Sequence, residues 1–167
     1  MLLDCSLFMI LQYVFAELDI NNKSELIDYL CKVQNDFDPP LFDRIKNRSN
    51  VANVENYAEK LLNNANVLVY KNIKTNDIIG LIAIYTNDRI NFEAYIPLLS
   101  VHVDWSGKGL ASKLIEHSIQ TAIENGMKTI KVKTWSSNYK AIALYTKFEF
   151  RIVSKDEFNV MFIKEIV

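Results

Sequence analysis

Hydrophobic and polar positions alternate along this chain with the two periods that distinguish strands from helices. Apolar runs or strict alternation between polar turns predict strands, whereas apolar residues spaced by three and four predict helices. The predicted strands are Gln12 to Ile20, Val67 to Lys71, Ile78 to Thr86, Phe92 to Val103, Ile130 to Trp135, Phe150 to Ser154 and Phe158 to Lys164. The predicted helices run from Ser24 to about Asn35, from Val54 to Asn64 and from Gly109 to Glu124, with a short helical piece that starts at Asp38-Pro39-Pro40.

The helix predicted from Gly109 to Glu124 stands between two strands, so residues 92–135 form a strand–helix–strand unit with a right-handed crossover. The pattern therefore predicts an α/β fold whose mixed sheet is flanked by helices. Ligands of such units bind at the carboxyl ends of the strands. No repeat, low-complexity tract or linker rich in Pro, Gly and Ser interrupts the sequence, so residues 1–167 are expected to form one domain.

The chain has 167 residues, half of them apolar, which suits a single domain with a sizeable core. Cys5 and Cys31 form neither a metal-type pair nor a disulfide framework, so both are expected to be small core residues in a reducing cytoplasm. The apolar run from Leu7 to Ala16 is half as long as a membrane span, and no Lys or Arg precedes it. We therefore expect a cytoplasmic protein without a membrane partner.

Charge is unevenly distributed, although the net charge is only −1. Residues 1–100 carry 9 basic and 13 acidic side chains, whereas residues 101–167 carry 10 basic and 7 acidic side chains. A basic second half favours an anionic ligand, but the same imbalance also arises by chance on solvated faces. No basic run is interleaved with aromatic residues, which argues against a nucleic-acid partner.

An extended segment runs into a glycine turn and then into an amphipathic helix at Val103-Asp104-Trp105-Ser106-Gly107-Lys108-Gly109-Leu110-Ala111-Ser112. Gly107 and Gly109 leave the backbone free to adopt positive φ and to approach a ligand closely. Successive N–H groups can then point at one anion, with the positive end of the helix dipole behind it. The segment therefore predicts a phosphate site, and a diphosphate is the expected anion.

A second motif lies in the short helix that follows the strand ending near Thr134-Trp135. Asn138, Ala141 and Tyr145 are spaced by three and four, which places all three on one stripe of that helix. The small Ala141 leaves room for an elongated group alongside. Alternatively, Tyr145 is an ordinary core aromatic residue and Asn138 is a residue of the helix N-terminus.

Together these two motifs resemble the GCN5-related N-acetyltransferase (GNAT) family, most clearly between Ile78 and Val153. The resemblance implies a mixed, mostly antiparallel sheet of about six or seven strands flanked by helices, and acetyl-CoA as co-substrate without a metal. Two positions depart from the family pattern: Ser106 stands where the loop usually begins with Arg or Gln, and Glu149 stands where members usually have Gly. Ser106 lacks a long donor, and Glu cannot adopt positive φ cheaply.

The resemblance also assigns roles to individual residues. Asn138 would hydrogen-bond the pantetheine amides, and the Tyr145 phenol, with an ordinary pKa of about 10, would protonate the leaving thiolate. Backbone N–H groups in the strand from Leu98 to Val103, with Val101 the preferred donor, would hold the thioester carbonyl. The expected residues of the acetyl-CoA site are Leu99, Val101, Val103, Ser106, Gly107, Lys108, Gly109, Leu110, Ala111, Ser112, Asn138, Ala141 and Tyr145.

Transfer to an amine also requires a group that removes the amine proton. Glu93, on the strand that leads into the site, is the preferred carboxylate, with Asp104, His102 and a water chain as alternatives. Each of these side chains could instead be an ordinary strand or turn residue. His117 lies off the apolar stripe of its helix and is expected to face solvent.

We therefore expect direct acetyl transfer from acetyl-CoA to the primary amine of a small molecule, such as an amine or an amino sugar. No covalent enzyme intermediate is expected, because neither cysteine is placed to act as a nucleophile. The family uses the region around Asp36-Phe37-Asp38-Pro39-Pro40 as a variable wall of the acceptor cleft, and its acids fit a cationic acceptor. The alternatives are acetylation of a protein N-terminus or lysine, and a non-catalytic acyl-CoA-binding regulatory domain. The protein is expected to be a monomer or a homodimer.

Overall fold

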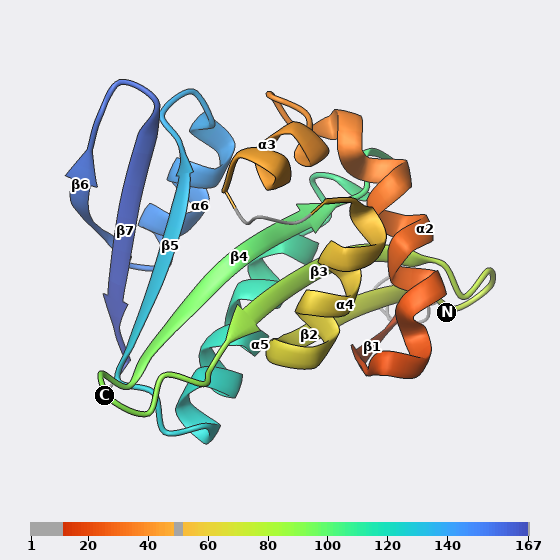
Figure 1. The fold of residues 1–167 in the computed structure, drawn as a ribbon, viewed down its shortest axis with the longest axis horizontal. Helices are drawn as coiled ribbons and strands as arrows, with labels where there is room; N and C mark the ends of the chain where they lie inside the picture. Colours follow the sequence, from red (N-terminus) through yellow and green to blue (C-terminus); the bar gives the residue numbers. More distant parts are fainter. Residues whose placement is uncertain (1–11, 49–51, 167) are drawn as a thin grey trace, which may run out of the picture.

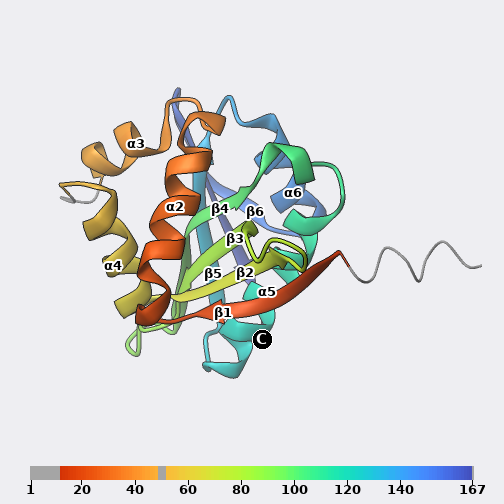
Figure 2. The same ribbon diagram turned by 90° about the vertical axis from the view of Figure 1, so that its right-hand side faces the viewer.

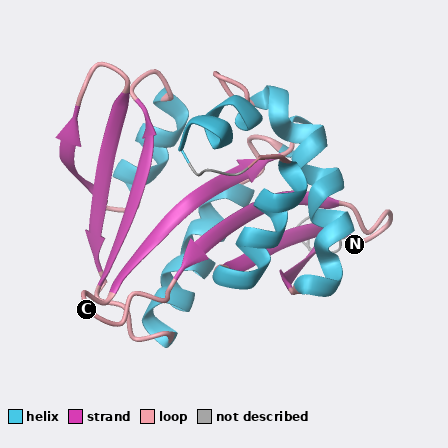
Figure 3. Ribbon diagram, in the orientation of Figure 1, coloured by secondary structure: helices cyan, strands magenta, loops and turns pink. Residues whose placement is uncertain are grey.

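The computed structural model describes residues 12–48 and 52–166 and joins all seven predicted strands in one sheet (Figure 1, Figure 3). The strands are β1 (Tyr13–Leu18), β2 (Asn66–Asn72), β3 (Ile78–Tyr85), β4 (Glu93–Val101), β5 (Thr129–Trp135), β6 (Arg151–Lys155) and β7 (Asn159–Glu165). The helices are α2 (Lys23–Val33), α3 (Leu41–Arg48), α4 (Val54–Asn64), α5 (Leu110–Glu124) and α6 (Tyr139–Lys147). Three short 3₁₀ turns are η1 (Ile20–Asn22), η2 (Gln34–Asp36) and η3 (Val103–Trp105).

The strand order is β1-β2-β3-β4-β5-β7-β6. β4 and β5 run parallel, and every other neighbouring pair is antiparallel. Helix α5 provides the crossover between β4 and β5, because two parallel strands cannot be joined by a tight turn. This confirms the prediction of a mixed, mostly antiparallel sheet of about six or seven strands.

Helices cover both faces of the sheet: α2, α3 and α4 lie on one face, and α5 and α6 lie on the other (Figure 2). The side chains of β2 alternate between the two apolar cores that result. Val67 and Val69 belong to the core formed with α2 and α4, whereas Leu68 and Tyr70 belong to the core formed with α5. The continuous apolar runs of β2 and β3 are thus the pattern of strands that are buried on both faces.

The parallel pairing of β4 and β5 ends partway along the strands. It runs from Glu93 opposite Thr129 to Ile96 opposite Val132, and the next residue of β4 is Pro97, which has no N–H group to donate. Beyond this point the two strands diverge into a V (Figure 1). Their carboxyl ends therefore border a wedge instead of a continuous sheet.

His117 on α5 does not face solvent as expected. Its ring stacks on Phe15 with 3.9 Å between the ring centres, and its Nε2 hydrogen-bonds the Tyr70 hydroxyl at 2.9 Å. The prediction was wrong because the edge strand β1 covers this side of α5, which the helical stripe alone does not reveal.

Cys31 is exposed, so the prediction that it is a core residue was wrong, while Cys5 lies outside the described residues. Within residues 12–48 and 52–166, no helix combines the length and the apolar character needed to cross a membrane.

Candidate functional site

A cavity of about 260 Å³ fills the wedge between the diverging ends of β4 and β5. It is lined by Phe37, Leu41, Arg44, Ile45, Tyr57, Lys60, Tyr85, Tyr95, Ile96, Pro97, Leu98, Leu99, Val132, Lys133, Thr134, Trp135, Asn138, Ala141 and Tyr145. A second cavity shares four of these residues and continues past the end of β4 to Ser100 and Val101. The wedge is therefore a cleft at the carboxyl ends of the strands, where the strand–helix–strand unit predicts a ligand.

Backbone N–H groups of β4 point into this wedge. The N–H of His102 donates to the carbonyl oxygen of Ile79 on β3 at 2.9 Å. Since the hydrogen-bonding direction alternates along an antiparallel strand, the N–H groups of Val101 and Leu99 point the other way, towards β5. In the described part of the sheet β5 pairs with β4 only as far as Ile96. The Leu99 donor is thus directed at both cavities and the Val101 donor at the second, which is the orientation required to hold a carbonyl oxygen.

The glycine turn lies at the same end of β4. Gly107 and Gly109 have φ angles of 76° and 81°, in the left-handed region that glycine enters without a steric penalty. Gly109 is the N-cap of α5 and supplies no side-chain cap. The first hydrogen bond of the helix runs from the Lys113 N–H to the Gly109 carbonyl oxygen at 3.2 Å. The amides from Leu110 to Ser112 therefore have no partner within the helix and can bind an anion.

Val103 and Ser106 lie in the turn between β4 and this helix. Val103 begins η3 and is 64% exposed, because the chain turns away from the sheet after Val101. The N–H of Ser106 donates to the Val103 carbonyl oxygen at 3.1 Å. This amide is therefore used within the turn, and the amides that remain for an anion begin at Gly107.

Lysine side chains gather near the start of α5. Lys147 on α6 places its Nζ 3.3 Å from Ser112 Oγ, which joins α6 to the first turn of α5. Lys113 Nζ donates to the Tyr13 hydroxyl at 2.8 Å, and this hydrogen bond raises the pKa of Lys113. Lys108 is exposed in the glycine turn itself. The helix end therefore combines free amides with positive charge, as a diphosphate site requires.

Helix α6 places the second motif along the cavity. Asn138 is its N-cap: the side-chain Oδ1 accepts from the Ala141 N–H at 3.2 Å. Both residues are half-buried and line the cavity. The role of Asn138 as a residue of the helix N-terminus is compatible with ligand binding, because the cap uses the carbonyl oxygen and leaves the amide nitrogen to donate.

Tyr145 is buried, and its ring lies 5.6 Å from the ring centres of both Phe150 and Phe162. It nevertheless contributes to the lining of the cavity. Burial raises the pKa of its phenol well above the ordinary value. The hydroxyl therefore stays protonated and can donate to a group in the wedge, so Tyr145 both packs in the core and lines the candidate site.

Three further tyrosines, which the sequence pattern does not single out, also line the cavity. They are Tyr57 on α4, Tyr85 on β3 and Tyr95 on β4. Tyr85 and Tyr95 face each other across the antiparallel pair of β3 and β4. Burial raises the pKa of Tyr57 and of Tyr85, so both phenols remain neutral donors. Alternation along the strands could have suggested Tyr85 and Tyr95, whereas nothing in the sequence indicates that Tyr57 reaches the same cavity.

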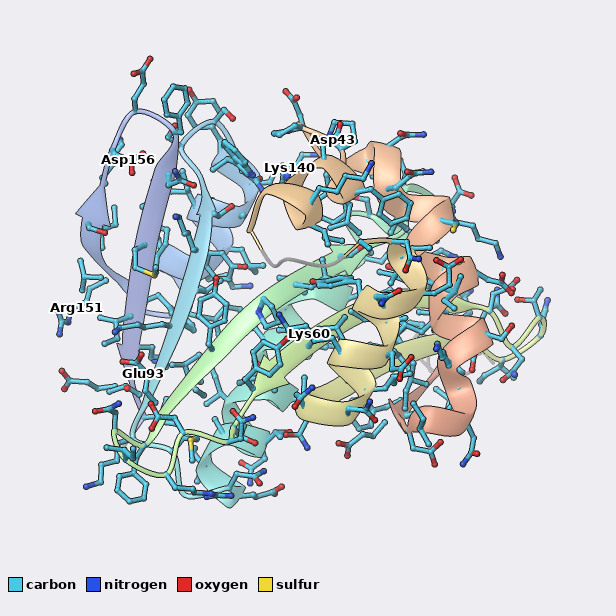
Figure 4. All side chains as sticks on the ribbon, viewed as in Figure 1. Asp43, Lys60, Glu93, Lys140, Arg151 and Asp156 are labelled. Carbon is cyan, nitrogen blue, oxygen red and sulfur yellow. The ribbon has the colours of Figure 1, made fainter. Side chains whose placement is uncertain are left out.

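Glu93 stands at the first position of β4 and is not part of the cavity lining. Its carboxylate pairs with Lys131 Nζ on β5 at 2.8 Å, near the beginning of the strand (Figure 4). It shares one face of β4 with Tyr95, two residues further along. The structure therefore separates this predicted base from the cavity, and a proton would reach it only through water.

Asp104 and His102, the other predicted bases, lie in the turn after β4. His102 Nδ1 accepts from the Asp104 N–H at 3.2 Å, and the Asp104 side chain is 78% exposed. Of the described residues that line the main cavity, none is a carboxylate or a histidine. Tyr145 thus lines the main cavity and Val101 the second, and none of the three predicted bases lines either cavity.

Arg44 closes the outer wall of the cavity. Its guanidinium carbon lies 5.2 Å from the ring centre of Phe37 and 5.3 Å from that of Trp135. The guanidinium also donates to the backbone carbonyl oxygens of Asp38 and Pro39. These contacts hold the segment after η2 against β5, so the segment expected as the acceptor wall does reach the cavity, through Phe37.

The acids of this segment do not line the main cavity. Asp36 and Asp38 border the second cavity instead. The charged residues that line the main cavity are Arg44, Lys60 and Lys133. The expectation of an acidic wall is therefore wrong for the main cavity, because the helix and strand that complete it contribute lysines.

The profile of the acetyltransferase (GNAT) family matches residues 28–150 of the chain. The N-alpha-acetyltransferase MAK3 of Arabidopsis thaliana is 34% identical over 62 residues, which cover 37% of this chain and 33% of that protein. The chain therefore spans about a third of the length of this relative.

Two solved structures show the same fold. An acetyltransferase of the GNAT family from Staphylococcus aureus MU50 superposes with a TM-score of 0.74 at 19% identity, covering 93% of this chain and 99% of that chain. The NatC complex bound to Gag peptide and CoA gives a TM-score of 0.73 at 21% identity, again with 93% and 99% coverage.

Proposed function

The chain belongs to the acetyltransferase (GNAT) family, and from this premise we propose that it transfers the acetyl group of acetyl-CoA directly to the primary amine of a small molecule. The observation that carries the proposal is the wedge between β4 and β5, where Tyr145 lines the main cavity and the Val101 N–H points into the second cavity, which adjoins the first at Leu99 and Asn138. Its volume of about 260 Å³ is at the small end of ligand pockets and fits a small acceptor.

In this proposal the end of β4, the start of α5 and the stripe of α6 hold acetyl-CoA. The amides from Gly107 to Ser112 bind the diphosphate, with the dipole of α5 behind it. The pantetheine arm lies between β4 and α6, where the Asn138 amide nitrogen can donate to its amides. Ala141 presents only a methyl group, which leaves space for the arm.

The reaction forms one C–N bond and breaks one C–S bond. The amine nitrogen attacks the thioester carbonyl carbon, and the Val101 N–H stabilises the negative charge that develops on its oxygen. When the C–S bond breaks, the thiolate takes the proton of the Tyr145 hydroxyl, and water later restores that proton. The amine gives up its own proton to water, directly or through water to Glu93.

A protein N-terminus is the second candidate acceptor, because the 62-residue match is to an N-alpha-acetyltransferase. A peptide needs an open path that leads away from the wedge. The second cavity, between Asp36 and Ser137, offers such a path.

Mass spectrometry of the purified protein with acetyl-CoA tests both candidates on one panel of amines, amino acids, amino sugars and peptides with free N-termini. We expect an added acetyl group on small acceptors and equal release of free CoA, neither of which occurs without the protein. Acetylation of peptides alone would replace the small-molecule proposal with the second candidate. A lack of product from every acceptor would overturn acetyl transfer.

A further inference from the structure

Three cationic side chains line the main cavity, and they come from three separate elements: Arg44 from α3, Lys60 from α4 and Lys133 from β5. The whole chain has a net charge of −1, so this concentration of positive charge is local. Figure 4 shows Lys60 over the middle of the sheet, well away from Glu93 at the start of β4. The described residues that line the main cavity include no carboxylate, whereas Asp36 and Asp38 border the second cavity, which Arg44 also lines.

Lys60 and Lys133 form no ion pair with any residue that the structure describes, although acids are close in sequence. Lys131, two residues before Lys133, is bound by Glu93 at 2.8 Å. Glu59, the neighbour of Lys60, pairs instead with a lysine of α2 at 2.6 Å. These two acids are therefore engaged outside the cavity. Backbone hydrogen bonds lower the pKa of Asp156, an acid outside the cavity lining, and the charge of Lys133 lowers it further without an ion pair between the two. The two lysine ammonium groups thus stay available to a ligand.

A cationic lining decides which acceptors bind well. Like charges disfavour each other, so the cavity lowers the pKa of a bound ammonium group and repels molecules with several ammonium groups. An anionic group is attracted by the same side chains, more strongly in a partly enclosed wedge than on an open surface. Tyr57 and Tyr85 stay protonated because burial raises their pKa, and they add O–H donors for the oxygens of an anion.

We propose that the acceptor is a small primary amine that carries an anionic group, a carboxylate or a phosphate, in the same molecule. The inference rests on the proposed acetyl transfer and names the acceptor class for that site. Lys60 and Lys133 hold the anion while the amine faces the Val101 end of the wedge. The same cations favour the neutral amine that attack requires, which compensates for the lack of a carboxylate in the described lining. An amino-acid-like acceptor therefore fits better than an amino sugar with several ammonium groups.

Matched pairs of acceptors test this inference: an amino acid with its carboxamide, and O-phosphoethanolamine with ethanolamine. The measurement is kcat/KM from the release of CoA. We expect at least a tenfold preference for the anionic member of one pair, and the pair with the larger preference identifies the anion. Lys60→Met and Lys133→Met should each reduce that preference about tenfold through KM, with little change for the neutral member. Lys155→Met, on the exposed strand β6, is the matched control and should change neither.

Calorimetric binding of the same amines to the protein with CoA separates this inference from the proposed function. In one outcome, anionic amines bind in a way that depends on Lys60 and Lys133 but give no acetylated product. That result would support the anion site and overturn acetyl transfer. Equal turnover of neutral, dicationic and anionic amines, unaffected by the two lysine variants, would overturn the anion site and leave acetyl transfer standing. Absence of both binding and turnover for every anionic amine would overturn both. Thermal melting checks that the variants remain folded, as expected for side chains that are at most half-buried.

Discussion

At the scale of single residues, Tyr145 packs in the core and also presents a phenol to the wedge. Tyr145→Phe keeps the ring between Phe150 and Phe162 and removes only the hydroxyl. We therefore expect kcat to fall about 10²- to 10⁴-fold while the calorimetric affinity for CoA is unchanged. Tyr139→Phe is the matched control, because Tyr139 begins the same helix and is 77% exposed. An unchanged kcat, when chemistry limits the rate, would leave Tyr145 with packing alone.

Glu93 reaches the wedge only through water, so its role as a base depends on that path. If it accepts the amine proton, Glu93→Gln should lower kcat/KM and remove the rise in rate that accompanies deprotonation of a carboxylate. The control is Glu165→Gln, which also removes a carboxylate with a cationic partner, Arg151, but away from the cavity. A pH–rate profile of Glu93→Gln that keeps its shape and height would assign Glu93 to its ion pair with Lys131.

Glu149 occupies the turn after α6 with a φ of 61°, a conformation that glycine adopts without steric cost. The family usually has Gly there, and the chain keeps the turn in spite of the substitution. Glu149→Gly should raise the free energy of unfolding by about 0.5–1 kcal/mol, because relief of the strain exceeds the added freedom of the unfolded chain. Glu149→Ala removes the same exposed carboxylate but retains the Cβ, so denaturant titration should show no such gain. Equal effects of both changes would attribute the result to charge.

At the scale of elements, the sequence predicts what depends on local pattern. The apolar stripe of α5 predicts a helix buried on one face, and the apolar runs of β2 and β3 predict strands buried on both faces, because the period of apolar residues differs between these cases. The wedge is different, since it depends on where β5 stops pairing with β4, and only Pro97 marks that position in the sequence. Tyr57 and the strand tyrosines line the same cavity only because of tertiary packing, which the spacing of residues along the chain does not predict.

The glycine turn before α5 is the element on which CoA binding depends in this proposal. A Cβ at Gly109 meets no atom within 4 Å, but its φ of 81° disfavours any other residue, and the side chain would stand at the free amides. Gly109→Val should therefore weaken CoA binding at least tenfold by calorimetry. Gly126→Val is the matched control at the other end of α5, with a φ of 75° and equally open surroundings. Comparable loss of affinity in both variants would indicate a general effect of strain instead of an anion site.

At the scale of the whole molecule, the wedge lies between the two helical layers that cover opposite faces of the sheet. Helices α2 and α4 support β4 from one face, and α5 and α6 provide the opposite wall (Figure 2). A buried hydrogen bond of 3.0 Å joins the Tyr29 hydroxyl on α2 to Ser100 Oγ on β4. Ser100 stands between Leu99 and Val101, whose N–H groups point into the wedge, where both residues line the second cavity. The position of those donors therefore depends on the layer that lies on the far side of the sheet.

Removal of one hydroxyl of this pair tests that dependence. Tyr29→Phe leaves Ser100 Oγ buried without its partner, which should cost about 1 kcal/mol of stability and lower Tm by about 2–4 °C in a chain of this length. Because the end of β4 is then less firmly held, we also expect a lower kcat with little change in CoA affinity. Ser100→Ala and the double variant complete a cycle in which the two losses should overlap by about 1 kcal/mol, since both remove the same bond. Strict additivity of the two changes, together with an unchanged kcat, would show that α2 supports the fold without positioning the donors of β4.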